Sequence, residues 1–357
     1  MKSFRLQALC VIVICSAACA VRAKVPPPQM EFVLGTVCSV NLYEDGSDKL
    51  YSRIFTRIRE IDRTMSAVPG SQASGQEVSE VVRINRNAGI APVRVSAELF
   101  DVLERALYYA ELSGGAFDPT IGPLVMLWGI GTPAERIPDE AEIAGALSLV
   151  DWRDLVIDRE AGTVFLRRPG MALDLGGIAK GYAADEAARL AREGGAWRGI
   201  FDLGGNILAL GGRDNGGDNR GEAVPWRIGV QDPLGERGAY IGVLPVRDKS
   251  IVTSGIYERY FEAGGRRYHH ILSTGDGRPV NNGLLSVTII ADYSIDADGL
   301  STTVFALGYE KGRALVEALA NTEAIFVFED RTVKITAGIE GIFSLTVSNY
   351  TLCHKST

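Results

Sequence analysis

The spacing of hydrophobic and polar residues along the chain predicts both strands and helices. Apolar and polar residues alternate over Phe32–Tyr43, as in a strand with one buried face. Apolar residues then recur every three or four positions from Leu50 to Met65, which predicts a helix with one buried stripe. Similar patterns predict further helices over Ala97–Leu112 (capped by Ser96), Pro138–Val150 and Ile178–Glu193, and further strands over Thr163–Arg168 and Phe201–Leu210.

After Trp226 the pattern becomes a series of short alternating segments. They predict strands over Trp226–Val230, Tyr240–Val246, Ile251–Phe261, Tyr268–Leu272 and Leu284–Ala291, a helix over Asp298–Ala320, and strands near Ala324–Phe328, Thr332–Ile335 and Ile342–Val347. Elements that segregate in this way predict the α+β class, with largely antiparallel or mixed sheets and packed helices. The chain of 357 residues shows no repeat and no clear linker, so we expect a single domain over 32–357.

The segment Leu173–Asp185 combines a strand end, a glycine pair and the start of a helix. Gly176 and Gly177 allow backbone to pass close to a bulky ligand, and the helix that opens at Ile178 directs N–H groups and its positive dipole end the same way. This arrangement predicts a phosphate-binding site, although neither the P-loop spacing nor the GxGxxG motif is present. The alternative is an ordinary strand-to-helix turn with a solvated Lys180.

Charge and composition narrow the range of partners. The net charge is −7 and the pI is about 5.2, and no dense cluster of Lys and Arg occurs. Proteins that bind nucleic acids need such clusters to neutralise phosphate backbones. We therefore expect no nucleic-acid partner.

The N-terminus has the pattern of an export signal. Lys2 and Arg5 precede the apolar run Leu6–Ile14, which is too short to be read as a membrane span. The segment Ser16–Cys19 is similar to a bacterial lipobox, which predicts a signal peptide over 1–18, a lipid on Cys19 and a tether over 19–31. The alternative is soluble secretion after cleavage at Ala23.

Few residues are available for soft metal ligands or disulfides. Outside the signal and lipobox, only Cys38 and Cys353 remain, so one long-range bridge is the most that can form, and two cysteines cannot build a zinc site. The chain has three histidines, and His269 is adjacent to His270, which argues against a multi-histidine metal centre.

Asp298 and Thr302 are candidates for binding a hard cation. A spacing of four residues places both side chains on one face of a helix, which we expect at its first turn. Two oxygen ligands suit Mg²⁺, which keeps positions open for substrate phosphates. The alternative is a helix start in which Asp298 interacts with the dipole and Thr302 bonds to the preceding turn.

His270 is a candidate general base. It lies on a predicted strand beside His269, and alternation along a strand places the two rings on opposite faces. One ring can then face a site while the other faces core or solvent. A histidine titrates near neutral pH and can take the proton of a hydroxyl nucleophile, although a lone histidine is more often structural.

Taken together, the motifs resemble the bacterial FAD:protein FMN transferases, the ApbE family, from about Phe32 to at least Leu307. The order and number of these motifs make the resemblance specific. They are Leu34-Gly35-Thr36, Met65-Ser66 with Ser79-Glu80, Phe117–Pro123, Leu127-Trp128-Gly129, Asp174–Asp185, Gly204-Gly205-Asn206, Thr253-Ser254-Gly255, His270-Ile271 and Asp298–Thr302.

The resemblance implies transfer of FMN from FAD to a Ser or Thr hydroxyl of an exported or membrane redox protein, with release of AMP. It further implies Mg²⁺ on the pyrophosphate, bound by Asp298, Thr302 and the carbonyl of Ala179, with His270 as the base. We expect the following residues around FAD, including Lys180 of the segment Leu173–Asp185 and otherwise as the resemblance implies: Leu34, Val68, Ala116, Phe117, Asp118, Gly176, Lys180, Tyr182 and Leu272. The expected location is the periplasmic side of the inner membrane.

Two positions depart from the family pattern. Val68 replaces a Tyr that would stack on the flavin, within a segment between Ser66 and Ser79 that we expect to be a mobile loop. An open wall there would admit water, so FAD hydrolysis to FMN and AMP is an alternative activity. Asp276 replaces a Thr in the turn after His270. A third alternative, of another class, is a periplasmic lipoprotein that binds FAD without chemistry.

Overall fold

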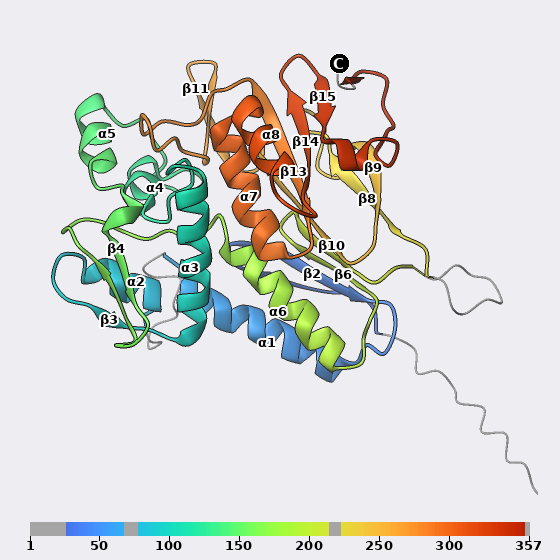
Figure 1. Cartoon of the computed structure of the whole chain (residues 1–357), viewed down its shortest axis with the longest axis horizontal. Helices are drawn as coiled ribbons and strands as arrows, with labels where there is room; N and C mark the ends of the chain where they lie inside the picture. The colour runs from blue at the N-terminus through green and yellow to red at the C-terminus, as the bar shows by residue number, and fades with distance from the viewer. Residues whose placement is uncertain (1–25, 68–77, 214–222, 354–357) are drawn as a thin grey trace, which may run out of the picture.

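The computed structural model describes residues 26–67, 78–213 and 223–353, and Figure 1 shows how their helices and strands are arranged. The helices are α1 (Asp48–Met65), α2 (Glu80–Arg86), α3 (Ala97–Leu112), α4 (Gly122–Trp128), α5 (Glu140–Leu147), α6 (Ala179–Glu193), α7 (Ser294–Leu307) and α8 (Tyr309–Glu317), with short 3-10 turns at Trp152–Asp154 and Ala337–Ile339. The strands are β1 (Gln29–Val33), β2 (Thr36–Leu42), β3 (Val93–Arg94), β4 (Leu155–Asp158), β5 (Thr163–Leu166), β6 (Gly199–Leu203), β7 (Asn206–Leu210), β8 (Trp226–Gln231), β9 (Tyr240–Val246), β10 (Lys249–Gly255), β11 (Tyr260–Ala263), β12 (Arg266–His269), β13 (Leu284–Ala291), β14 (Glu323–Phe328), β15 (Thr332–Ile335), β16 (Ser344–Leu345) and β17 (Thr351–Cys353).

A nine-stranded sheet in the order β1-β2-β6-β7-β10-β13-β14-β15-β17 forms the centre of the protein. Its neighbouring strands are antiparallel, except that β15 and β17 run parallel. Smaller sheets have the orders β16-β9-β8, β3-β5-β4 and β11-β12. The predicted α+β class with largely antiparallel sheets is confirmed.

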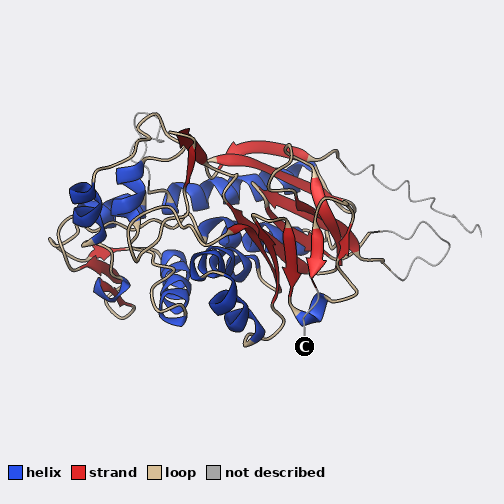
Figure 2. Cartoon of the chain, turned by 90° about the horizontal axis from the view of Figure 1, so that it is seen from above, coloured by secondary structure: helices blue, strands red, loops and turns tan. Residues whose placement is uncertain are grey.

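The two faces of the central sheet are covered differently. The helices α1, α6 and α7 pack on one face and share a large apolar core with it. The sheet of β8, β9 and β16 contributes to a second apolar core, on the other face. Figure 2 shows the strands gathered toward one end of the molecule, with helices along one face of them and beyond. Because both faces are covered, β13 is buried along its whole length.

Local sequence signals place several elements correctly. Helix α3 spans Ala97–Leu112 as predicted, and the hydroxyl of Ser96 accepts the N–H of Leu99. Helix α1 buries the predicted apolar stripe. Helix α6 runs from Ala179 to Glu193 and ends at Gly194. No helix among the described residues is long and apolar enough to cross a membrane, and the predicted signal, Cys19 and most of the tether lie outside those residues.

The prediction of one strand over Phe32–Tyr43 is wrong, because the chain reverses within it. Leu34 and Gly35 have φ angles of 56° and 68° and form a two-residue turn between β1 and β2. The same error occurs at Phe201–Leu210, where Gly204 and Gly205, with φ angles of 65° and 93°, connect β6 to β7. Gly204 and Gly205 therefore form a hairpin turn; a Gly-Gly pair between two apolar runs is a signal for such a turn, and the prediction of one strand overlooked it.

Other boundaries also differ. Ile251–Phe261 contains two strands, β10 and β11, and strand β12 ends at His269, so His270 follows it. The helix predicted from Asp298 begins four residues earlier, at Ser294, and Gly308 divides it into α7 and α8. Asp298 therefore lies in the second turn. Between Ser66 and Asn87, helix α2 occupies Glu80–Arg86, while Val68 and the rest of 68–77 lie outside the described residues.

Helices α6 and α7 cross with their backbones in direct contact. A Cβ atom on Gly181 would lie 2.3 Å from the carbonyl oxygen of Ser294 and 2.7 Å from the Cα atom of Ile295. Both obstructing atoms are main-chain atoms, so neither can rotate away. Only glycine allows this crossing, which brings the start of α6 beside the middle of α7.

We predict that Gly181→Ala lowers the free energy of unfolding by about 2–3 kcal/mol, because the added methyl group forces the two backbones apart. Gly145→Ala is the matched control. Gly145 is also helical, but nothing lies within 4 Å of its Cβ position, so this change should be neutral or stabilise by up to about 1 kcal/mol. Urea unfolding of both variants measures the difference. Equal stabilities would contradict the prediction.

Candidate active site

The candidate site lies at the end of the central sheet where the turns Leu34-Gly35 and Gly204-Gly205 meet. A Cβ atom on Gly204 would lie 2.4 Å from Oγ1 of Thr36, so the two turns are in contact. Strand β10 ends at Gly255 on the same side, because its partners in β7 and β13 fix its register. The start of α6 and the middle of α7 cover this end.

Asp298 is the buried carboxylate of the site. The residue is 3% exposed, and its Oδ2 accepts the N–H of Gly181 at 2.9 Å. Its Oδ1 lies 3.4 Å from Nζ of Lys180, which also donates to the carbonyl oxygen of Gly176 at 2.9 Å. The ammonium group therefore lies between two oxygen atoms. Burial of a carboxylate without such a positive partner would cost several kcal/mol.

Thr302 lies one turn beyond Asp298 on α7. Its Oγ1 is 3.4 Å from the hydroxyl of Ser254, which also bonds to Ser301 at 2.9 Å. A Cβ atom on Gly177 would lie 3.2 Å from this Oγ1 and 3.2 Å from the ring of Phe117. Gly177 thus permits a close approach of backbone to side chains, as expected for the glycine pair.

These groups have the chemistry of a site for a hard divalent cation. Asp298, Thr302 and Gly176 supply oxygen atoms, and the Lys180 ammonium already stands as a positive charge between two of them. Ala179, whose carbonyl was predicted to be a ligand, is the buried first residue of α6. The described part of the chain contains no cluster of three or more His, Cys, Asp or Glu side chains able to hold a metal. The residues fit Mg²⁺, and their ligand roles stay predictions.

The start of α6 offers fewer free N–H groups than the glycine pattern suggested. The N–H groups of Ile178 and Ala179 both donate to the carbonyl of Leu175, and that of Gly181 donates to Asp298. The N–H of Gly176 donates to Asp174. An incoming phosphate would therefore rely on side chains more than on this helix end.

The two adjacent histidines have different environments. His269 is buried, its Nε2 bonds to the carbonyl of Val280 at 2.9 Å, and its Nδ1 accepts the N–H of Ile271, so it is part of the core. His270 is half-buried, and its Nδ1 lies 3.2 Å from the carbonyl oxygen of Arg259. Because a carbonyl oxygen only accepts, Nδ1 carries the proton and Nε2 has a free lone pair.

The surroundings of His270 keep its ring neutral. Loss of hydration around the ring lowers its pKa well below the ordinary value of 6.5, and the positive charges of Arg259 and Lys180 lower it further. The adjacent His269 packs its ring edge-on against Phe305 of α7, so the histidine segment lies against the helix that carries Asp298. An uncharged imidazole with a free Nε2 is the form that accepts a proton.

The segment Ala116–Asp118 is held rigidly next to the site. Oδ1 of Asp118 accepts both the N–H and the hydroxyl of Thr120 at 2.7 Å, and Oδ2 accepts the N–H of Trp152 at 2.9 Å. Burial raises the pKa of this carboxyl, against the lowering effect of those bonds. Because its bonds are made within the protein, Asp118 shapes the loop that presents Phe117. Its predicted contact with FAD stays a prediction.

The turn after His270 contacts the same segment. Oγ1 of Thr274 donates to the carbonyl of Gly115 at 2.7 Å, and Nε1 of Trp128 donates to the carbonyl of Gly277 at 2.8 Å. Leu272 is buried just before this turn, in a small apolar cluster. The altered family motif therefore still ties the histidine segment to Ala116.

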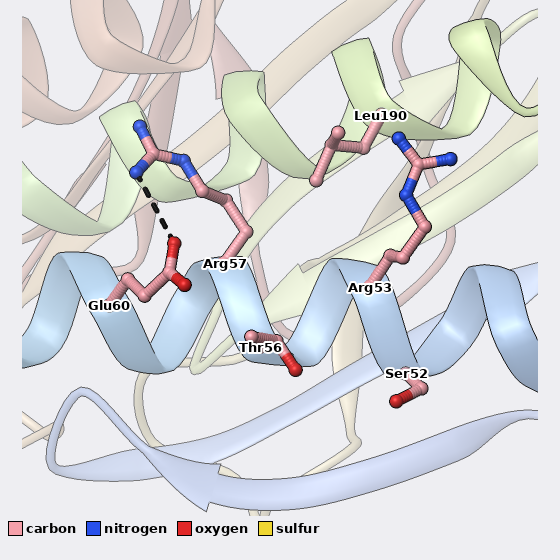
Figure 3. A pocket seen from close by; sticks show the side chains of 6 residues that line it. All are labelled: Ser52, Arg53, Thr56, Arg57, Glu60 and Leu190. Carbon is pink, nitrogen blue, oxygen red and sulfur yellow. Dashed lines mark ion pairs between the residues drawn. The ribbon is translucent and has the colours of Figure 1, made fainter.

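Tyr182 points away from Lys180, since two residues on a helix are about 200° apart. Its hydroxyl lies 3.4 Å from Arg57, which pairs with Glu98 at 2.7 Å and Glu186 at 2.9 Å. Arg57 also borders a surface hollow of about 280 Å³ between α1 and α6, where it approaches Glu60 (Figure 3). The hydroxyl of Tyr182 thus joins an ion-pair network, and its role toward FAD stays a prediction.

Leu34 and Cys38 lie on the first hairpin. The N–H of Leu34 donates to Asp62 at 3.2 Å, and its side chain packs against the main core. Cys38 is fully buried and Cys353 is exposed, and both are free thiols, so the long-range disulfide is not formed. Burial and the charges of Asp202 and Asp62 raise the pKa of the Cys38 thiol to about 12, while Lys180 acts in the opposite direction.

Comparison with known proteins assigns the chain to a family. The family model described as the ApbE family matches residues 34–326, which is most of the chain. The chain belongs to the ApbE family. Its predicted relationship is confirmed.

Relatives and solved structures in the ApbE family match nearly the whole chain. An FAD:protein FMN transferase of Treponema pallidum is 39% identical over 339 residues, which cover 92% of each chain. One from Klebsiella pneumoniae is 36% identical over 318 residues, covering 89% of this chain and 94% of the relative. The ApbE protein of Thermotoga maritima superposes with a TM-score of 0.77 at 31% identity, covering 88% of this chain and 98% of that one. The flavin transferase ApbE of Vibrio cholerae superposes with a TM-score of 0.74 at 27% identity, with the same coverage.

Sequence reasoning missed two residues that position the ApbE motifs. Oδ1 and Oδ2 of Asp185 on α6 accept the N–H groups of Ser294 and Ile295 at 2.8 and 2.9 Å, and so cap α7 from another helix. Asn85 forms two hydrogen bonds with the backbone of Leu173, at 2.7 and 3.0 Å, where the glycine motif begins. No local pattern marks either contact, because both partners are distant in sequence.

Asp185 gives stability a specific pH dependence. Burial raises its pKa from 3.8 to about 6 in the folded protein, although its two hydrogen bonds oppose the shift. A raised carboxyl pKa adds stability that is fully present below the unfolded value near 4 and is lost as the pH rises through about 6. Asp185→Asn should remove this contribution, which is at most about 3 kcal/mol.

We therefore predict that wild type gains stability relative to Asp185→Asn as the pH falls from 7.5 to 4.5. Chemical unfolding at the two pH values measures the gain. Asp45→Asn, the same change at an exposed position with a left-handed backbone that Asn tolerates, is the control. A difference that is independent of pH would show that Asp185 does not take up a proton in this range.

Proposed function

We propose that this protein transfers FMN from FAD to a Ser or Thr hydroxyl of an acceptor protein and releases AMP. The observation that carries the proposal is a neutral His270 with a free Nε2, in a segment that packs against α7, the helix of Asp298 and Thr302. A pure FAD-binding protein has no need of a base beside the phosphates. The names of the T. pallidum and K. pneumoniae relatives support the same reaction.

In this proposal the residues of the site divide the work. Nε2 of His270 takes the proton of the attacking hydroxyl, whose oxygen bonds to the phosphorus on the FMN side while the bond to the AMP phosphate breaks. The Arg259 carbonyl fixes the ring so that Nε2 stays unprotonated. The Lys180 ammonium, 23% exposed, is available to balance phosphate charge once it leaves Asp298.

We further propose that Asp298, Thr302 and the carbonyl of Ala179 hold Mg²⁺. When bound, the ion would stabilise the negative charge that develops on the pyrophosphate. The buried, oxygen-only donor set around Asp298 supports this choice over a softer metal.

The acceptor that we propose is an exported or membrane redox protein. The export signal and the lipobox ending at Cys19 support a location on the periplasmic side of the inner membrane, with a lipid anchor. Labelling with a radioactive fatty acid tests the anchor. If Cys19→Ala leaves label and membrane partition unchanged, the lipid anchor on Cys19 is excluded and soluble secretion is the remaining interpretation.

Mass spectrometry of a candidate acceptor, incubated with the protein, FAD and Mg²⁺, tests the function. An added FMN mass on a Ser or Thr, with an equal amount of AMP, is the expected result, and Asp298→Ala should abolish it. Free FMN and AMP without an adduct, across several acceptors, would make FAD hydrolysis the main activity. Val68 favours hydrolysis because it replaces a Tyr that would stack on the flavin. Bound FAD without any AMP would leave a binding protein.

We predict that the rate of transfer stays level as the pH falls from 8 to 6.5 and declines only at lower pH, where His270 becomes protonated. The reason is that its pKa lies well below 6.5. His270→Asn should slow transfer about 10²- to 10⁴-fold while FAD binding changes little. A pH–rate profile with an acid limb centred at or above 6.5, or an unimpaired variant, would exclude His270 as the base.

A further inference from the structure

Asn206 is a buried amide without a visible structural purpose. It is the first residue of β7 and is 2% exposed. Its Nδ2 has no hydrogen-bond partner among the described residues. A buried donor that remains unpaired loses its interactions with water without compensation, so its presence needs an explanation.

The register of the central sheet shows where this amide lies. Directly paired residues on neighbouring strands form a row that crosses the sheet and points toward the helices: Cys38, Leu203, Asn206, Val252 and Ile289. The other members of this row all belong to the apolar core beneath α1, α6 and α7. Asn206 is thus the polar member of an otherwise apolar row.

The charge of Lys180 acts on groups at both ends of this region, while its ammonium group is held by Gly176 and Asp298. This charge lowers the pKa of Cys38, on one side of Asn206. It also lowers the pKa of Glu258, whose carboxyl pKa is raised chiefly by loss of hydration. Oε1 of Glu258 lies 3.9 Å from the Cβ position of Gly205, the residue before Asn206. Lys180 therefore acts on groups on both sides of the unpaired amide.

Ser254 locates the amide relative to the cation-binding groups. It follows Val252, the partner of Asn206, by two positions, so the side chains of Asn206 and Ser254 emerge on the same face of the sheet. The hydroxyl of Ser254 is the one that contacts Ser301 and Thr302. Diagonal neighbours of this kind are about 7–8 Å apart, which is the scale of a pyrophosphate with its ligands.

We propose that Asn206 is a substrate-binding residue whose Nδ2 donates a hydrogen bond to a pyrophosphate oxygen of FAD. This inference rests on the proposed flavin transfer. The amide is 2% exposed in this structure, so binding of FAD would have to move the groups that cover it. An NH₂ group suits a phosphate oxygen because it only donates, and it adds no charge beside Asp298 and Glu258.

The test compares FAD with riboflavin, which has the same flavin ring but no phosphate, in binding experiments with three variants. Asn206→Leu removes the donor at nearly constant volume, and Asn206→Asp replaces the donor by a negatively charged acceptor. Ser286→Ala is the control, because Ser286 is also fully buried with an unpaired hydroxyl but belongs to β13. Ser286 is paired with Gly255, which lies three residues from Val252 along β10. Its side chain therefore lies on the other face of the sheet, like that of Thr253.

For Asn206→Leu we expect the dissociation constant of FAD to rise about ten- to a hundredfold, as for loss of a hydrogen bond to a charged group. Asn206→Asp should weaken FAD binding at least as much. The dissociation constant of riboflavin should stay within about twofold of wild type in both variants, and the midpoint of thermal unfolding of Asn206→Leu should not fall. Ser286→Ala should leave both ligands unaffected.

Equal losses of FAD and riboflavin, or FAD binding within twofold of wild type, would overturn the inference. Failure of both variants to fold would likewise assign Asn206 a structural role. If Asn206→Leu alone fails to fold, Asn206→Asp decides. A wild-type protein that does not bind FAD at all would instead remove the proposed function, so the two failures are distinguishable.

Discussion

The hydrogen bond from the N–H of Gly181 to Asp298 depends on a backbone-to-backbone crossing of α6 and α7. The same crossing fixes the positions of the neighbouring charged groups. It brings Lys180 next to Asp298, and it places Asp185 where both carboxylate oxygens cap the start of α7. The two helices therefore act as one unit, fixed at two points about one turn of α6 apart. Asp298, which we propose as a cation ligand, is thus positioned by this helix pair rather than by a loop.

The sequence predicted well what is determined locally. The stripe of α1, the Ser96 cap of α3 and the limits of α6 follow from periodicity and capping, which involve residues a few positions apart. The turn between β1 and β2 was missed because Leu34 adopts a positive φ angle, which is rare for leucine, whereas the Gly204-Gly205 turn was missed although its glycine pair is a turn signal. The start of α7 was misplaced because its cap comes from Asp185 on another helix. The family motifs supplied the candidate site residues, whose roles stay predictions, whereas the unpaired amide of Asn206 is evident only in the structure.

Electrostatic balance explains why the protein can bury Asp298 in the absence of a ligand. The carboxylate receives one neutral donor from Gly181 and one charged group from Lys180. An exchange of Lys180 for a metal cation would conserve this balance and free the ammonium group for a phosphate. A buried pair of this kind contributes little net stability, but removal of either partner is costly. The role of the pair is therefore to hold Lys180 and Asp298 in place rather than to add net stability.

The burial of Cys38 has a consequence for the thiol chemistry of the chain. Disulfide exchange and oxidation both proceed through the thiolate, and a thiol whose pKa is about 12 carries almost none at neutral pH. The thiol also donates to the carbonyl of Val33 within the sheet and is fully shielded from solvent. Once folded, this cysteine is redox-silent. Among the described residues, the exposed Cys353 alone can react with oxidants or foreign thiols, so dimers linked through it would form at the edge strand β17, at the opposite edge of the central sheet from β1.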